Sequence, residues 1–291
     1  MNKSSIFVGV DAAWQNSGAL DWALREAHLR DLPVRAVHVV EEKLPAGPYF
    51  AAPGVDAAAK QLIADVGDYL AGHDDGAEYT TDVLTGPPAS KLAKAASGAA
   101  MLVVGRRGTG LLSRLLIGST AEAVTHLADV PVVVVPDRWQ PYHPGAPVVV
   151  GVDESDQDDA AIAFAIAAAT ERKVPLRMVR VWDLPAMYTW DAAAVTNQYD
   201  GWLEESDKAL QAMADQWRVK FPELEIRTET RRGHPVAGLI SAAEENKADL
   251  LVLGGRNHRR ITTMLLGSTA RGVLHHAPCP VAVVHEVPRQ K

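Results

Sequence analysis

The chain contains the same glycine-rich segment twice. Residues 102–120 read LVVGRRGTGLLSRLLIGST, and residues 251–269 read LVLGGRNHRRITTMLLGST. In both copies a short apolar run ends at a glycine, Gly105 or Gly254, and a Gly-Ser-Thr triplet follows 13 residues after it. Backbone N–H groups in such a turn and at the start of the next helix are unpaired donors, and the helix dipole favours negative charge there. The duplication therefore predicts two phosphate-binding sites built on one repeated unit.

The repeat extends beyond this segment in both directions. The sequence VGVD occurs at residues 8–11 and again at residues 150–153. A Gly-x-Pro triplet occurs at residues 86–88 and again at residues 233–235. A repeated unit of this size indicates that each half of the chain folds as a separate copy of one domain.

The join between the copies is marked by its composition. Residues 137–147 read DRWQPYHPGAP, with three prolines and one glycine, which is typical of a linker. We therefore predict one domain over residues 1–137, a linker over 138–147 and a second domain over 148–291.

The overall composition excludes several classes of protein. The net charge of −7 and the pI near 5.8 argue against nucleic acid as a partner. No apolar stretch approaches the length of a membrane span and the chain starts without an apolar signal segment, so we expect no membrane partner and a cytoplasmic protein. The one cysteine, Cys279, is expected to be a buried, inert thiol.

Short apolar runs alternate with helical patterns throughout both halves. Because runs such as PVVVV do not alternate with polar residues, the strands are expected to be covered on both faces. The alternation predicts an α/β fold with two tandem, doubly wound, five-stranded parallel sheets. Strands are expected near 6–10, 34–40, 79–84, 101–104 and 132–135, then near 148–152, 176–182, 225–231, 250–253 and 281–284, with first-half helices near 17–30, 56–71, 88–97 and 119–128.

The spacing Gly105-x2-Gly108-x9-Gly118-Ser119, with the VGVD and Gly-x-Pro elements, resembles the ATP-binding motif of the universal stress protein family. The resemblance covers nearly the whole chain, as two tandem copies. It implies a Rossmann-like sheet with strand order 3-2-1-4-5, which holds ligands where the ends of strands 1 and 4 meet. Asp11 ends the first strand and Gly105 follows the fourth, so both should line one crevice.

The first predicted site combines glycines, arginines and one acid. The glycines are expected to adopt positive φ and to let phosphate approach the backbone, while Gly118 and Ser119 open the next helix. The resemblance implies that Asp11 lies near the ribose and adenine and that the backbone of Val39 reads the adenine edge. The predicted ATP-binding residues are Gly9, Asp11, Val39, Gly105, Arg106, Arg107, Gly108, Thr109, Gly110, Leu111, Gly118 and Ser119.

The second predicted site departs from the family pattern. Asn257 stands where the first copy has Gly108, and Arg259 stands where it has Gly110. Asparagine tolerates left-handed geometry, and the arginines either bind phosphate or fill its space. The predicted residues are Gly151, Asp153, Val181, Gly254, Gly255, Arg256, Asn257, His258, Arg259, Arg260, Gly267, Ser268 and Thr269.

Each of these residues also has an interpretation without a ligand. A glycine after a strand is a turn residue by default, and an aspartate at a strand end is often a turn former. The segments 105–119 and 254–268 each carry three arginines and no acid, which favours a polyphosphate, although solvated arginines would show the same pattern.

These observations leave two functions open. The first is a stress or signalling regulator that binds adenine nucleotide as ATP, with or without Mg²⁺, and acts on an unknown protein partner. The second is a non-catalytic interaction module with vestigial nucleotide sites. Neither is an enzyme. The last strands, 132–135 and 281–284, are apolar edges, and we predict that the tandem domains pack through them as a pseudo-dimer, or pair as a homodimer.

Overall fold

The computed structural model describes residues 4–41, 54–73, 78–108, 117–140, 144–153, 159–183, 192–255 and 266–285. They form two compact units that divide between Gln140 and Pro141, inside the predicted linker. No helix in these ranges is both long enough and apolar enough to span a bilayer. The predicted packing of the two halves on each other stays a prediction.

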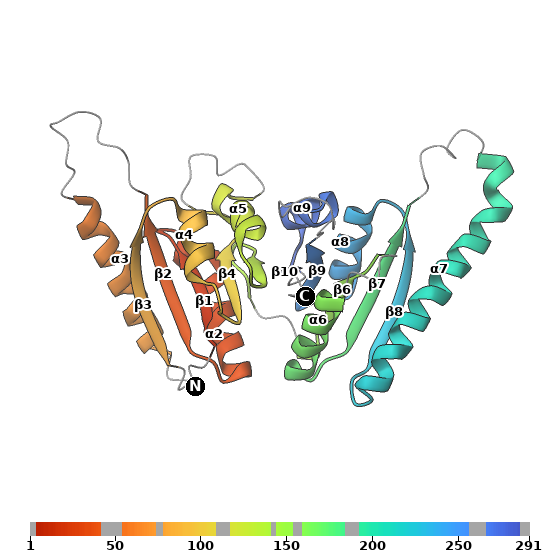
Figure 1. The fold of residues 1–291 in the computed structure, drawn as a ribbon, viewed down its shortest axis with the longest axis horizontal. Coiled ribbons are helices and arrows are strands. Elements are labelled where there is room, and N and C mark those ends of the chain that lie inside the picture. The colour runs from red at the N-terminus through yellow and green to blue at the C-terminus, as the bar shows by residue number, and fades with distance from the viewer. Residues whose placement is uncertain are drawn as a thin grey trace, which may run out of the picture. The chain divides into compact units, whose positions relative to one another are not determined.

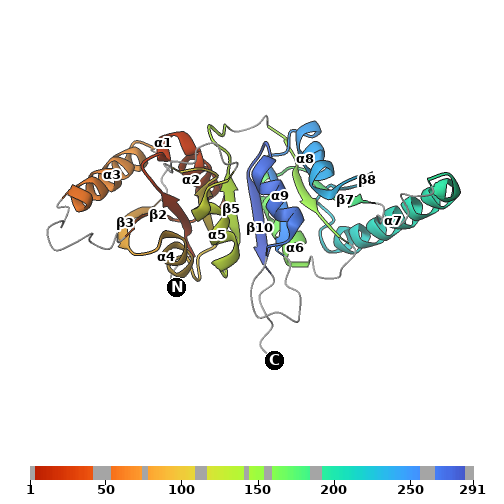
Figure 2. The same ribbon diagram turned by 90° about the horizontal axis from the view of Figure 1, so that it is seen from above.

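The first unit is a five-stranded parallel sheet covered by helices on both faces. Its strand order is β3-β2-β1-β4-β5 (Figure 1), as the family resemblance implied. Helices α1, α2 and α3 cover one face and α4 and α5 the other (Figure 2). The strands are β1 (Ile6–Val10), β2 (Val34–Val40), β3 (Tyr79–Thr85), β4 (Met101–Gly105) and β5 (Val132–Val135), and the helices are α1 (Trp14–Ser17), α2 (Ala19–Arg30), α3 (Gly54–Ala71), α4 (Pro88–Ala95) and α5 (Ser119–Leu127).

The second unit repeats this architecture. Its strands are parallel and lie in the order β10-β9-β6-β7-β8, which is the same 3-2-1-4-5 arrangement read from the other edge. Its strands are β6 (Val148–Gly151), β7 (Leu176–Trp182), β8 (Ile226–Arg232), β9 (Leu250–Gly255) and β10 (Val281–His285), and its helices are α6 (Asp159–Arg172), α7 (Ala192–Lys220), α8 (Pro235–Glu245) and α9 (Ser268–His276).

The central strands are buried because helices pack on both faces of each sheet. Val103 in β4 and Val252 in β9 are both fully buried. The expectation from their unbroken apolar runs is therefore confirmed, and the polar groups that can meet a ligand are confined to the strand ends and the loops that follow them.

The helix predicted near 17–30 is confirmed as α2, which begins at Ala19, after Gly18. Gly18 has φ 65° and separates α1 from α2. A Cβ at Gly18 would come within 2.8 Å of the Cβ of Trp139, which is buried against it. Arg138 donates its N–H to the carbonyl of Asn16, and the guanidinium of Arg25 lies over the Trp139 ring. The start of the predicted linker is thus packed on the first unit.

Each unit buries an arginine ion pair at an equivalent helix position, with a different acid. In α2, Arg30 pairs with Glu26 of the same helix. In α6, Arg172 pairs with Asp249, which precedes β9, and its side chain also donates to the carbonyl of Ala168. The side chains of Arg172 and Asp249 are 2% and 3% exposed, so the pair lies fully in the interior.

Candidate functional site

The ends of β1 and β4 meet in the first unit, as the strand order requires. Gly9 in β1 lies in register with Val104 in β4, and Asp11 follows directly after β1. Oδ2 of Asp11 lies 2.2 Å from the position that a Cβ on Gly108 would take. The structure therefore brings the aspartate after β1 and the glycine turn after β4 into contact, which is the crevice that the sequence predicted.

Asp11 also forms the turn that follows β1. Its Oδ1 accepts the backbone N–H of Ala13 at 2.9 Å, and its carbonyl accepts the N–H of Trp14 at 3.0 Å. One carboxylate oxygen thus holds the turn and the other faces Gly108. The turn-forming role and a ligand-binding role are compatible, because they use different oxygens.

The glycine-rich loop of the first unit is closed at its neck. Gly118 donates its N–H to the carbonyl of Arg106 at 2.7 Å, and Arg106 donates its own N–H to the carbonyl of Val135 at 2.7 Å. Helix α5 then begins at Ser119, and its N-cap, Gly118, offers no side chain to the first N–H groups. The first N–H groups of α5 therefore lie where the two ends of the loop meet, and an anion can accept hydrogen bonds from them.

The expected positive φ at the first two motif glycines is wrong. Neither Gly105 nor Gly108 lies in the left-handed region. Both are needed for space instead, because a Cβ on Gly105 would come within 2.7 Å of the Cβ of Ser17 and a Cβ on Gly108 would overlap Asp11. Gly110 lies outside the described residues.

Positive φ occurs at the Gly-x-Pro elements. Gly86 has φ 130° before α4, and Gly233 has φ 126° before α8. Each donates its N–H to the carbonyl that ends the second strand of its unit, from Val40 and Trp182 respectively, at 2.9 Å. These glycines hold α4 and α8 against their sheets and do not line the crevice at the ends of the first and fourth strands.

The two arginines after β4 have different surroundings. Arg107 forms an ion pair with Asp137 at 2.5 Å, and its buried Nε has no hydrogen-bond partner in the described part of the chain. Burial lowers the pKa of Arg106, the charge of Arg107 lowers it further, and Asp137 opposes both. An acid therefore does accompany these arginines, because Asp137 reaches them from outside the segment 105–119.

Two further predicted residues have structural roles that the sequence did not reveal. A Cβ on Gly9 would come within 3.0 Å of Leu92 in α4, so this glycine lets the helix pack on β1. Val39 lies in β2 opposite Leu84, one residue beyond the register pair of Val10 and His38. This places Val39 at the level of the turn after β1, where its predicted contact with adenine stays a prediction.

The second unit reproduces the local geometry of the first. The N-cap of α9, Gly267, has φ −62° and ψ 150°, close to φ −74° and ψ 146° at Gly118. Ser268 and Thr269 open α9, and again no N-cap side chain covers the first N–H groups. Gly254 lies in β9 in register with Val284, and Asp153 follows β6.

Two side chains, His285 and Arg180, set the second crevice apart from the first. A Cβ on Gly255 would overlap the imidazole of His285, so packing explains this glycine. A Cβ on Gly151 would come within 2.8 Å of Leu253, which gives Gly151 the packing role of Gly9. Arg180 in β7 is 4% exposed and donates to the carbonyl of Asp153 at 2.9 Å. The sequence analysis did not single out Arg180, and an arginine inside an apolar strand was the signal that could have revealed it.

Not every predicted site residue can be placed. Val181 lies next to Arg180 in β7, where it meets Gly238 of α8, and its contact with a nucleotide stays a prediction. The residues of the two predicted sites that lie outside the described ranges are Thr109, Gly110, Leu111, Arg256, Asn257, His258, Arg259 and Arg260.

Comparison with known proteins agrees with the fold and the repeat. The model of the universal stress protein family matches residues 4–136 and again residues 146–285. The chain belongs to the universal stress protein family. It carries two tandem copies of the family's domain, and the two matches leave residues 137–145, within the proline-rich join, between them.

Relatives match over the full tandem length. A universal stress protein of Mycolicibacterium smegmatis is 34% identical over 295 residues, covering 96% of each chain. One from Mycobacterium tuberculosis is 30% identical over 301 residues, covering 97% of this chain and 96% of its own. Among solved structures, a universal stress protein from Archaeoglobus fulgidus has a TM-score of 0.71 at 18% identity, covering 98% of this chain and 99% of its own. This last similarity supports the fold alone.

Proposed function

We propose that the first unit binds ATP in the crevice between β1 and β4, and that its occupancy regulates which protein partner the chain engages. The contact between Asp11 and Gly108 carries this proposal. A carboxylate from one strand end lies where any side chain on the opposite loop would sit, so the loop backbone passes the acid at close range. With this close approach, we propose that the carboxylate of Asp11 and the backbone N–H groups of the loop face the same ligand.

The chemistry of the crevice matches the parts of ATP. The uncapped N–H groups at the start of α5 and the guanidinium of Arg106 would receive the phosphates. Oδ2 of Asp11 would accept a ribose hydroxyl, since its Oδ1 is already bonded to Ala13. The backbone near Val39 would then face the base.

We propose binding without hydrolysis. Among the described residues, the acids beside the glycine loop are Asp11, Asp137 and Glu122, which lies in the first turn of α5. Asp11 is bonded to Ala13, and Asp137 is paired with Arg107. A general base needs to reach an attacking water, and a Mg²⁺ site needs oxygen ligands in near-octahedral geometry. A Mg²⁺ ion would therefore be held mainly by phosphate oxygens and would arrive with the nucleotide.

The alternative is an interaction module whose sites are vestigial. Two observations favour it. Asp137 offsets the charge of Arg107 in the first unit, and His285 packs tightly on Gly255 in the second. In that case the fold would persist and neither crevice would bind nucleotide.

Calorimetric titration of the full chain with ATP separates the two proposals. Asp11→Ala should weaken ATP binding about tenfold by removing a charge-assisted hydrogen bond. The matched control is Asp21→Ala, which removes an equal charge from the first turn of α2, where Asp21 accepts the hydroxyl of Tyr69. Equal affinities in both variants would contradict the site, and absence of ATP binding by the parent chain would favour the interaction module.

The regulatory part needs a separate test. Proteins captured by the ATP-loaded chain should differ from those captured by a variant that cannot bind ATP. If the captured proteins are identical with and without nucleotide, occupancy does not regulate the partner.

A further inference from the structure

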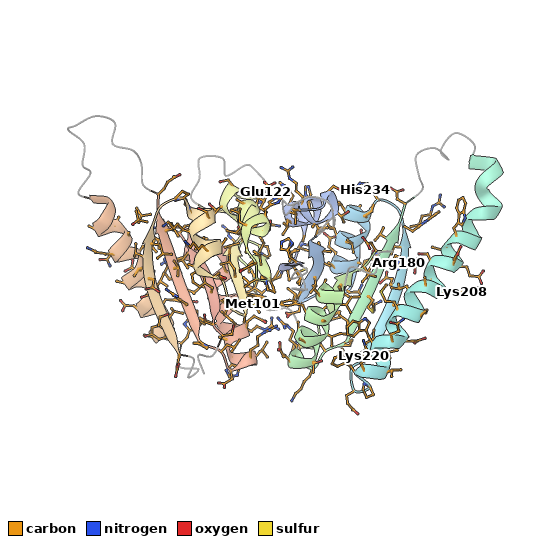
Figure 3. All side chains as sticks on the ribbon, in the orientation of Figure 1. Met101, Glu122, Arg180, Lys208, Lys220 and His234 are labelled. Carbon is orange, nitrogen blue, oxygen red and sulfur yellow. The ribbon has the colours of Figure 1, made fainter. Side chains whose placement is uncertain are left out.

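The second unit contains a buried arginine whose contacts are unusual. Arg180 lies in β7, is labelled in Figure 3, and is 4% exposed. Its two terminal nitrogens donate to main-chain carbonyls, to Asp153 at 2.9 Å and to Ser206 of α7 at 3.2 Å. Its Nε is buried and has no hydrogen-bond partner in the described part of the chain.

None of these partners offsets the charge of Arg180. A guanidinium is charged throughout the physiological pH range, and burying a charge without a counter-ion is unfavourable. Other buried arginines of the chain are treated differently: Arg30 pairs with Glu26, and Arg172 pairs with Asp249. Among the described residues no ion pair with an acid balances Arg180, whose guanidinium is held by main-chain carbonyls alone.

The charge lies at the edge of the second crevice. The register of β6 and β7 pairs Gly151 with Val179, so Arg180 occupies the position that His38 has in β2. His38 contacts the carbonyl of Val10 at 2.8 Å through Nδ1. The first unit thus places an imidazole under its crevice, and the second places a guanidinium beside the backbone of Asp153.

We propose that Arg180 determines the ligand specificity of the second site, by making it select phosphorylated nucleotides over the uncharged nucleoside. The proposal rests on nucleotide binding by this half. Arg180 acts through its electric field, because hydrogen bonds to the carbonyls of Asp153 and Ser206 hold its guanidinium in place. Salt screens a buried charge much less than an exposed one, so the field extends into the crevice.

The experiment measures ATP and adenosine affinities by titration calorimetry on the full chain. All variants are made in a chain that carries Gly108→Asp, which serves as the background. A second carboxylate beside Asp11 should prevent ATP binding in the first unit, so only the second site is measured. In this background Arg180→Met should weaken ATP binding about tenfold, the scale of one unit charge acting over roughly 10 Å at an effective dielectric constant of about 20. Adenosine affinity should change less than about twofold.

Two conservative variants distinguish the charge from the hydrogen bonds. Arg180→Lys keeps the charge and loses the two-carbonyl geometry, so it should retain the preference for ATP. Arg180→His introduces the side chain that the first unit carries at this position, and at pH 8 a histidine of ordinary pKa is neutral. It should lose the preference even if Arg180→Met fails to fold.

A matched control tests for structural damage. Arg218 in α7 also donates to a main-chain carbonyl, that of Ile226 at 2.7 Å, but this contact is at the start of β8. Arg218→Met should therefore leave both affinities unchanged.

Equal loss of ATP and adenosine affinity in Arg180→Met, or an unchanged ratio in both neutral variants, would overturn the inference and leave ATP binding intact as a proposal. If the Gly108→Asp background binds neither ligand, nucleotide binding by the second half is itself refuted, and the role of Arg180 is refuted with it.

Discussion

The contact between Gly108 and Asp11 gives a sharp prediction for Gly108→Ala. The added Cβ would lie 2.2 Å from Oδ2 of Asp11, so the carboxylate must move away from the loop. Because the same carboxylate accepts the N–H of Ala13, the movement strains or breaks a charge-assisted hydrogen bond. The substitution should therefore disturb the acid and the loop at once.

The size of the effect follows from that hydrogen bond. Hydrogen bonds to charged groups contribute about 1.5–3 kcal/mol. If ATP binding requires the original carboxylate position, Gly108→Ala should weaken ATP binding by about 10- to 100-fold, since about 1.4 kcal/mol corresponds to a factor of ten. The free energy of unfolding should fall by no more than about 3 kcal/mol, because one turn is affected.

Titration calorimetry with ATP measures the effect, and urea denaturation measures the stability of the same sample. The matched control is Gly118→Ala in the same loop. There the nearest atom to an added Cβ is the carbonyl oxygen of Arg106 at 3.4 Å, an ordinary contact, so ATP affinity should change far less. Unchanged affinity in Gly108→Ala, or equal losses in both variants, would refute the reasoning.

Three further predictions concern charge and burial. Asp137→Asn removes the counter-charge of Arg107, so calorimetry should show ATP binding tighter by about three- to tenfold, whereas unchanged affinity would place Arg107 outside the site. Asp249→Asn leaves Arg172 buried without its acid and should lower the free energy of unfolding in urea by about 3–5 kcal/mol; a loss below about 1 kcal/mol would count against the buried pair. Burial, reinforced by the charge of Asp249, raises the pKa of Cys279 to about 12, so iodoacetamide at pH 8 should label the thiol only after unfolding, and rapid labelling of the native chain would be inconsistent with this.

The strands could be predicted from the sequence because their signal is local. The expected strands at 6–10 and 34–40 coincide with β1 and β2, and the strand expected at 176–182 coincides with β7. Each is a mainly apolar run followed directly by an acid, Asp11, Glu41 or Asp183. The strand order followed from the family resemblance, and through it the meeting of Asp11 with the glycine loop.

The short helix α1 and the start of α2 after Gly18 could not be predicted in this way. The run at 17–30 has the periodicity of one helix, and Gly18 alone is a weak break signal. What fixes its left-handed conformation is the packing of Trp139, a residue more than a hundred positions later in a segment whose prolines indicated a linker. Contacts of such sequence separation leave no local pattern.

The electrostatics of the crevices also depend on distant residues. Counting charges within 105–119 missed Asp137, which reaches Arg107 because β5 lies beside β4 and both strands end at the same edge. Arg180 appeared as one polar residue in an apolar strand, and only the carbonyls of Asp153 and Ser206 explain its burial. In both cases the sheet, not the motif, decides which charges reach the ligand.

The number of ATP molecules bound per chain tests the central claim most directly. Equilibrium dialysis of the full chain against labelled ATP should approach two molecules per chain at saturation, with two distinct affinities of which the first unit's is tighter. Gly108→Asp should remove the tighter event and leave the weaker one. Absence of bound ATP at millimolar concentration would contradict the account and leave the chain as an interaction module on the same fold.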